Sequence, residues 1–245
     1  KHLSGSEKDT LFIHSVKASD SELALATLER ETRYFMYHIA RFVLSAFDHQ
    51  INFGTEQELH KGFLSKNITE KYEFIKQLHG KLYSYTIEME RYNMDKELII
   101  RLQQLISSSR NSMYAAKNLK DALPDIDHLR KSSNDSKYGF YILTREKIAV
   151  FYEAVIQLLN SKEKMGGLHS LSLLYSSVQI GYADALKTLY QDGNLKRMNE
   201  VEFSTLINFN REMYTLEKSI LFALKDFLLH ENEARAFDDL PGFIR

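Results

Sequence analysis

Two aspartates and a histidine near the middle of the chain could bind a divalent cation. Asp121, Asp125 and His128 are four and three residues apart, and residues at these spacings share one face of an α-helix. Carboxylate oxygens and an imidazole nitrogen are suitable ligands for such a cation. Pro124 lies inside the set, where a proline kinks or ends a helix. The favoured interpretation is a solvent-exposed helix end, with metal binding by the three residues as the alternative.

Histidines offer a second kind of chemistry. His38 and His49 are eleven residues apart, which returns them to nearly the same helix face. A single pair lacks the third and fourth ligands that transition metals need, so we expect amphipathic or hydrogen-bonded side chains. The tripeptide His60-Lys61-Gly62 is similar to a histidine phosphotransfer motif, but its spacing is one residue short. No Glu-x-x-His pattern occurs, which argues against a di-iron bundle.

The composition excludes several further classes of protein. The 245 residues include no cysteine, so disulfides, thiolate metal sites and a cysteine nucleophile are excluded. Lys and Arg number 32 against 33 Asp and Glu, and this balance argues against a nucleic-acid partner. Phosphate loops, nucleophile elbows and dinucleotide fingerprints are absent, so we expect no cofactor and no enzymatic activity. The longest apolar stretch, Ile148–Leu159, is interrupted by Glu153 and Gln157 and is too short to span a membrane.

Long helices must position these residues. Only 2 prolines and 10 glycines punctuate the chain, which is few for the turns of a multi-stranded sheet. Apolar residues recur instead at helical spacing, as Leu25, Leu28 and Phe35 do. The sequence predicts an all-α, elongated six-helix bundle with helices at Asp20–Gln50, Glu56–Asn93, Asp95–Arg130, Tyr138–Asn160, Leu168–Gln191 and from Asn199 onward.

Capping signals and polar linkers set the expected boundaries. Ser19 with Glu22, Thr55 with Glu58 and Asn199 with Glu202 read as capping boxes, and Asp192-Gly193 reads as a helix end. The polar linkers are Lys131–Lys137, Ser161–Gly167 and the tail from His230.

A faint internal repeat divides the chain in two. With a shift of 101 residues, Leu105-Ile106-x3-Arg110 falls on Leu206-Ile207-x3-Arg211. Each half then contains three helices. The predicted organisation is a linker at 1–18 that follows a preceding membrane region, a first half at 19–135, a second half at 136–231 and a C-terminal tail at 232–245.

Two local patterns sharpen this layout. Leu11-Phe12-Ile13 precedes Leu23-Ala24-Leu25, and Glu31 follows six residues after Leu25. The third helix carries Arg110-Asn-Ser-Met-Tyr-Ala-Ala-Lys-Asn-Leu-Lys-Asp121. With the two three-helix halves, these patterns resemble the PhoU-like C-terminal domain of bacterial Na⁺/phosphate cotransporter-family proteins. In that family the first pattern marks the junction with the membrane part.

One departure from the family concerns metal. PhoU proteins bind metal clusters through a repeated Glu/Asp-x3-Asp pattern on the third helix of each half. When the third helix is aligned with that pattern, Lys120 and Pro124 take the positions of the carboxylates, and the second half has Leu221 and Lys225 there. The resemblance therefore implies the fold and an association with a phosphate transporter, without the metal cluster.

The resemblance implies a non-enzymatic regulatory domain on the cytoplasmic side of the bacterial inner membrane. Its expected partner is the membrane-spanning part of the same polypeptide, and a homodimer is left open. Lys1 is not a methionine, and we interpret the chain as a fragment of a longer protein or one trimmed to its ordered part. The rival interpretation is a free-standing PhoU-type phosphate-signalling adaptor that binds a divalent cation through Asp121 and Asp125.

Overall fold

The computed structural model describes residues 10–49, 59–161, 167–191 and 198–241. Within these ranges the chain is helical and contains no β-strand, which confirms the predicted all-α class. A short 3-10 turn, η1 (Ile13–Ser15), precedes the long helices. These are α1 (Ser21–Ala46), α2 (Ile68–Met89), α3 (Lys96–Arg130), α4 (Asp135–Asn160), α5 (Gly167–Leu189) and α7 (Glu200–Leu228), and they are followed by the short α8 (Glu231–Asp238).

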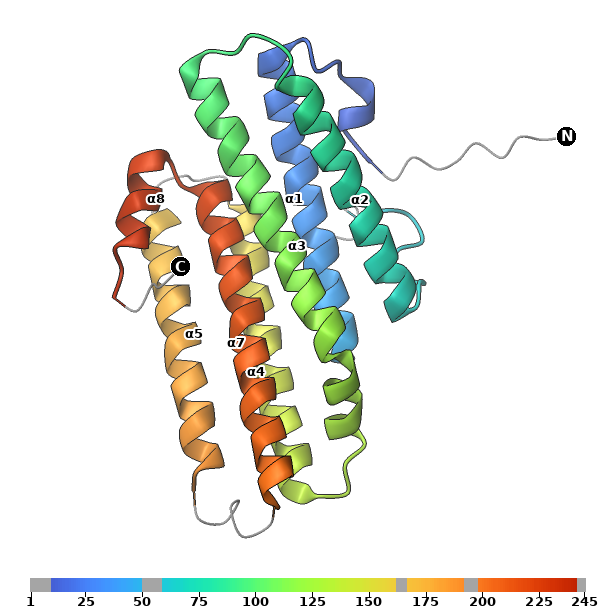
Figure 1. Cartoon of the computed structure of the whole chain (residues 1–245), viewed down its shortest axis with the longest axis vertical. Helices are drawn as coiled ribbons and strands as arrows, with labels where there is room; N and C mark the ends of the chain where they lie inside the picture. Colours follow the sequence, from blue (N-terminus) through green and yellow to red (C-terminus); the bar gives the residue numbers. More distant parts are fainter. Residues whose placement is uncertain (1–9, 50–58, 162–166, 192–197, 242–245) are drawn as a thin grey trace, which may run out of the picture.

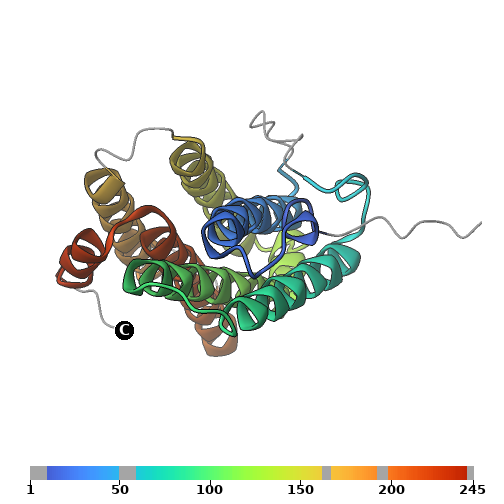
Figure 2. The same cartoon turned by 90° about the horizontal axis from the view of Figure 1, so that it is seen from above.

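The long helices form an elongated bundle around a central pair. In Figure 1, α1, α2 and α3 lie on one side of the molecule and α4, α5 and α7 on the other. Helices α3 and α7 run antiparallel, and they make the most extensive helix–helix contact. Figure 2 shows the bundle from one end, with α2 and α5 at its periphery. The two helix groups thus meet mainly along α3 and α7, whereas the division into two PhoU-like halves stays a prediction.

Helix α1 carries a large part of the core. Between Tyr34 and Leu44 every residue except Arg41 is buried, because neighbouring elements cover almost all sides of the helix. Its N-cap is Asp20, whose carboxylate accepts a hydrogen bond from the backbone N–H of Leu23. The expected cap at Ser19 is therefore wrong by one residue, whereas the predicted capping box of Asn199 and Glu202 at the start of α7 is confirmed.

The second and fourth helices begin at other residues than predicted. Helix α2 starts at Ile68, not near Glu56, because Asn67 and Glu70 form a capping box with both hydrogen bonds at 2.9 Å. Residues 60–66 form turns, and Gly62 has a left-handed φ of +81° that a helix does not allow. Helix α4 starts at Asp135, since Asn134 provides the cap. The predicted signals at Thr55–Glu58 and Asp192-Gly193 lie outside the described residues.

The segment after α7 is folded rather than a polar tail. Helix α8 follows α7 almost directly, and Phe237 on α8 is fully buried. The Phe237 ring packs edge-to-face on Tyr175 of α5, with 5.7 Å between the ring centroids. Helix α8 therefore closes the upper end of α5 and α7 (Figure 1).

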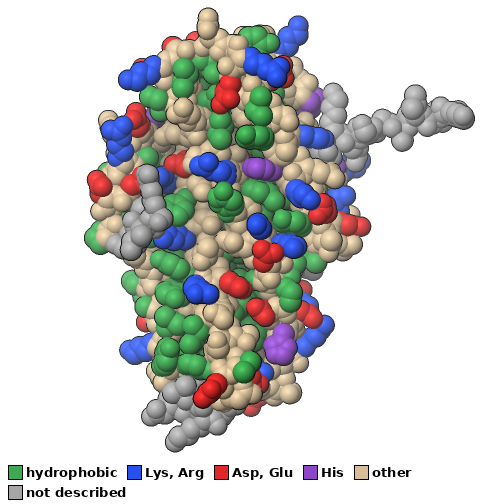
Figure 3. Space-filling model, viewed as in Figure 1, with side chains coloured by type: hydrophobic (Ala, Val, Ile, Leu, Met, Phe, Trp, Pro, Cys, Tyr) green, Lys and Arg blue, Asp and Glu red, His purple; other side chains and the backbone are tan. Residues whose placement is uncertain are grey.

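The surface is mixed in character. Figure 3 shows charged side chains over most of one face and a gathering of hydrophobic side chains over the lower part of α5 and α7. Along its length, helix α5 also carries exposed Leu173 and Ile180, which are 59% and 61% accessible. Among the described residues, no helix combines the length and the apolarity needed to cross a lipid bilayer.

Candidate functional site

The predicted cation ligands lie along one exposed stretch of α3. The helix continues through Pro124 to Arg130, so the proline does not end it. Asp121 and His128 are exposed and Asp125 is half-buried. The Asp121 carboxylate contacts Lys120 at 3.3 Å, which gives it a cation from its own helix.

An acidic residue of α7 lies close to these aspartates. Burial raises the pKa of Glu212, and the nearby charges of Asp125 and Asp121 raise it further. In the described ranges, however, no group of three or more His, Asp or Glu side chains is arranged to hold a metal ion. Asp121, Asp125 and His128 thus belong to no such group, since Asp121 and His128 are exposed and Asp125 is half-buried near Glu212.

A buried glutamate fixes the segment that leads into the bundle. Glu31 of α1 is fully buried and accepts three backbone hydrogen bonds, from Leu11 at 3.0 Å, Phe12 at 2.6 Å and Ile13 at 3.0 Å. Three N–H donors directed at one carboxylate compensate for its burial, and hydrogen bonds to a charged acceptor are the strong kind. The Arg30 guanidinium lies over the Phe12 ring, 4.1 Å from its centroid.

The rest of this segment is also packed on the bundle. Ile13 and Ala18 are buried, and the Tyr85 hydroxyl of α2 donates to the Val16 carbonyl at 3.1 Å. Residues 10–18, which we call the entry segment, are therefore anchored to the bundle through buried Thr10, Ile13 and Ala18, although the sequence suggested a linker. Glu31 thus binds the Leu11-Phe12-Ile13 backbone directly.

The buried His38 plays a structural role. Its Nδ1 lies 2.8 Å from the Tyr34 carbonyl, and its Nε2 accepts the backbone N–H of His60 at 2.9 Å. This pairing requires the neutral ring with the proton on Nδ1. Burial lowers the pKa of His38 to about 3, and the rings of Phe63 and Phe74 pack around it.

His49 and His60 also contact neighbouring parts of the bundle. His49 Nε2 lies 2.9 Å from the Arg145 carbonyl, so it links the end of α1 to α4. The His60 ring packs on Phe74, with 4.9 Å between centroids. The hydrogen-bonded interpretation of His38 and His49 is confirmed.

A large cleft lies at the upper end of the bundle. It has a volume of about 880 Å³ and is bounded by the entry segment and by α1, α3, α4, α5 and α7. Its walls include Phe12 of the entry segment, Arg30 and Arg33 of α1, Arg101 of α3 and Phe227 of α7. The cleft therefore meets both the entry segment and the central helix pair.

The arginines in this cleft differ in how they are paired. Arg101 forms an ion pair with Glu29 at 3.2 Å. Arg33 lies against the Phe227 ring, with its guanidinium carbon 5.5 Å from the centroid. Within the described residues the buried Nε of Arg33 has no hydrogen-bond partner. An acceptor group entering the cleft could satisfy this donor.

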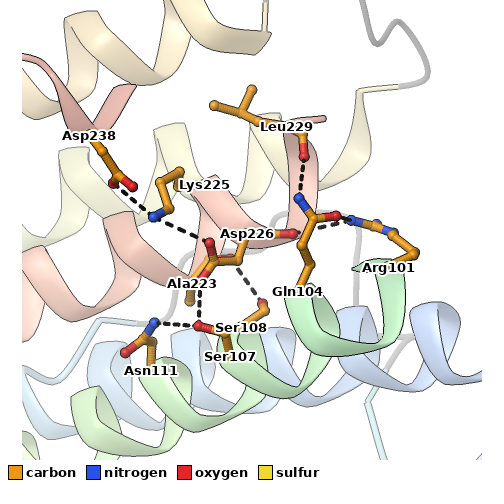
Figure 4. A network of polar contacts seen from close by, with 10 residues as sticks. All are labelled: Arg101, Gln104, Ser107, Ser108, Asn111, Ala223, Lys225, Asp226, Leu229 and Asp238. Atoms are coloured by element: carbon orange, nitrogen blue, oxygen red, sulfur yellow. Dashed lines mark hydrogen bonds and ion pairs between the residues drawn. The ribbon is translucent and has the colours of Figure 1, made fainter. Parts of the chain in front are cut away.

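A network of polar contacts supports the cleft wall between α3 and α7 (Figure 4). Arg101 donates to the carbonyls of Asp226 at 3.1 Å and Phe227 at 2.8 Å, and Gln104 donates to the Leu229 carbonyl at 3.2 Å. These carbonyls end α7 and lack partners within their own helix. Helix α3 thus caps the C-terminus of α7 with two side chains, which also suits the helix dipole because Arg101 is cationic.

The same network reaches α8. The Ser107 hydroxyl donates to the Asp226 carboxylate at 2.6 Å. Lys225 contacts Asp226 at 3.3 Å and Asp238 of α8 at 2.8 Å (Figure 4). One chain of contacts therefore joins α3, α7 and α8 behind the cleft.

Sequence reasoning missed this network, although a signal for it exists. Ser107, Ser108 and Ser109 form a polar run inside a long helix, where only large apolar residues would be expected to face the core. Small hydroxyl residues allow two helix backbones to approach closely, and Ser108 donates to the Ala223 carbonyl of α7 at 2.9 Å. The serine run therefore marks the contact of α3 with α7.

Comparison with known proteins identifies no family for this chain. The chain matches no family model, no curated protein and no solved structure.

Proposed function

We propose that this chain is a non-enzymatic regulatory domain, similar to the PhoU-like domains of bacterial Na⁺/phosphate cotransporter-family membrane proteins. It acts on the cytoplasmic side of the membrane, and its partner is the membrane-spanning part of the same polypeptide. Its role is to adjust phosphate transport through a change in helix packing.

The entry segment is the observation that carries this proposal. Glu31 ties its backbone to α1, so that the chain enters the bundle through a fixed connection rather than a flexible linker. Phe12 of the same segment also forms part of the cleft wall. A group that binds in the cleft and displaces Phe12 would therefore move the residues that precede the bundle, and interfaces of this kind switch between discrete packings.

The rival adaptor function has less support. It requires a divalent cation at Asp121 and Asp125, whereas the part of the chain that the structure describes contains no arrangement of acidic residues and histidines that could hold one.

Two experiments test the proposal. The first reads the coding sequence upstream of Lys1, where we expect several apolar spans of about 20 residues that contain small and polar residues. A start codon close to Lys1, with no such spans, would contradict it. The second compares sodium-dependent phosphate uptake by the complete wild-type protein and by its Glu31→Gln variant, with equal amounts of the two proteins in the membrane. We expect altered uptake in the variant, and unchanged uptake would argue against coupling through the entry segment.

A further inference from the structure

A second pocket lies in the other part of the bundle, away from the entry segment. It is enclosed by α4, α5 and α7 and has a volume of about 240 Å³. Phe140, Leu143, Ile148 and Met213 give it apolar walls. By the share of volume that one water molecule takes in the liquid, about 30 Å³, the space holds a ligand of about eight non-hydrogen atoms.

An acidic side chain lies inside this apolar pocket, and one of its carboxylate oxygens has no hydrogen-bond partner within ordinary distance among the described residues. The Glu217 side chain is only 1% exposed, and its Oε2 has no hydrogen-bond partner among the described residues. Its nearest cation is the Lys147 ammonium at 3.5 Å, which is longer than an ordinary N–H···O hydrogen bond. A buried carboxylate oxygen that lacks a well-placed donor is costly, so a group that supplies one would be bound favourably.

The surroundings of Glu217 favour a positive partner. Burial raises its pKa to about 7, and Lys147 opposes that rise only partly. The other titratable groups near Glu217 are Tyr152, Tyr214 on α7, and Asp184 on the pocket wall from α5. The Tyr152 hydroxyl is buried and also lacks a hydrogen-bond partner in the described structure. Two carboxylates against one ammonium leave this pocket with a net negative charge when Glu217 is ionised.

A glycine at the pocket wall leaves room for the Lys147 side chain. A methyl group at Gly181 of α5 would lie 2.6 Å from Cε of Lys147, which is closer than real contacts allow. The Lys147 stem therefore lies directly against the Gly181 backbone. Lysine is itself an alkylammonium, and its position shows that such a chain fits beside Glu217. Because the Lys147 side chain is 29% exposed, it can turn toward solvent and leave this space.

We propose that the pocket between α4, α5 and α7 binds a small apolar amine, whose protonated nitrogen donates to the Glu217 carboxylate while its hydrocarbon part contacts Leu143, Ile148 and Met213. This site is distinct from the cleft of the proposed function and does not depend on it. A carboxylic acid would pair with Lys147 instead, but it would place a second acid beside Glu217 and Asp184.

The test uses 3-methylbutylamine, which has six non-hydrogen atoms, together with the alcohol and the carboxylic acid of the same branched skeleton. Binding to the whole chain is measured by isothermal titration calorimetry and by saturation-transfer NMR at pH 6 and pH 8. We expect saturable binding of the amine, weaker by about tenfold at pH 6 because only about a tenth of Glu217 is then ionised. The alcohol and the acid should bind at least tenfold more weakly than the amine at pH 8.

Three variants separate this site from other sources of binding. Glu217→Gln should weaken amine binding at pH 8 by tenfold or more, whereas Glu153→Gln, at an exposed position of α4, should leave it unchanged. Ala185→Phe adds a large side chain to the pocket wall and should abolish binding with the carboxylate intact. Each variant is checked for the wild-type helical spectrum. The proposal is overturned if wild-type protein shows no saturable amine binding, if the acid binds better than the amine, or if folded Glu217→Gln or Ala185→Phe binds the amine as wild type does.

Discussion

Replacement of Glu217 by glutamine should stabilise the protein above neutral pH. The ordinary pKa of a glutamate is 4.5, and burial raises that of Glu217 to about 7. Between these values the folded protein holds a proton that the unfolded chain has released, so the stability of the wild type falls as the pH rises through this window. A difference of about 2.5 between the two pKa values, at about 1.4 kcal/mol each, corresponds to about 3 kcal/mol at pH 8. Glutamine has nearly the same shape and does not titrate, so the variant escapes this loss.

The assay is urea denaturation of wild type and Glu217→Gln at pH 4.5 and pH 8. We expect free energies of unfolding that differ by only about 0.4 kcal/mol at pH 4.5, because the carboxyl group is then protonated in the folded protein and half protonated in the unfolded chain. At pH 8 the variant should be more stable by about 3 kcal/mol, or by roughly 6–12 °C in melting temperature for a chain of this length. Because the two proteins are compared at the same pH, the contributions of other titrating groups to stability, such as that of His38, cancel. Glu153→Gln serves as the control, because Glu153 is exposed on α4 and should show no such difference.

Either of two results would refute this reasoning. If Glu217→Gln is less stable than wild type at pH 8, the Lys147 ion pair outweighs the burial of the carboxylate. The same difference in stability at pH 4.5 and pH 8 would show that Glu217 does not titrate in this window.

Three further predictions concern other parts of the molecule. Glu31→Gln should lower the free energy of unfolding by about 2–4 kcal/mol, because backbone N–H groups of the entry segment lose their charged acceptor. A loss of stability below about 0.5 kcal/mol in a urea titration would contradict the fixed connection. His38 should stay neutral at pH 5 in ¹⁵N NMR spectra, and a protonated ring at this pH would refute the buried neutral tautomer. The free energy of unfolding should fall as the pH drops below 6.5 toward about 3, since the ring takes up a proton in the unfolded chain but not in the folded protein. Phe237→Ala should lower the free energy of unfolding by about 3–5 kcal/mol or detach α8, which limited proteolysis would detect. Unchanged stability and unchanged resistance to the protease would mean that α8 does not anchor the upper end of the bundle.

The helical class and most helix positions follow from the sequence because they depend on local patterns. Apolar spacing of three and four residues predicts α3 and α7 well, and the capping box of Asn199 and Glu202 sets the start of α7. The start of α2 was missed because two capping signals lie close together. The Asn67 and Glu70 signal begins the helix, and the left-handed turn at Gly62 precedes it.

The sites depend on contacts between distant segments, which local patterns do not contain. Glu31 is separated from the backbone groups it binds by about twenty residues, and nothing in its own helix marks it as buried. Glu217 and Lys147 come from different helices, and each alone reads as ordinary helix surface. For Asp121, Asp125 and His128 the spacing alone left metal binding open as an alternative to an exposed helix end, and among the described residues they belong to no group of three or more possible metal ligands.

The most direct test of the proposed regulatory function is sodium-dependent phosphate uptake by the complete protein, compared with a form that stops before Thr10. Both forms are expressed at equal amounts in cells that lack other phosphate uptake. Loss of the helical bundle should change the rate of uptake or its response to phosphate supply. Identical uptake with and without the bundle would contradict the regulatory function.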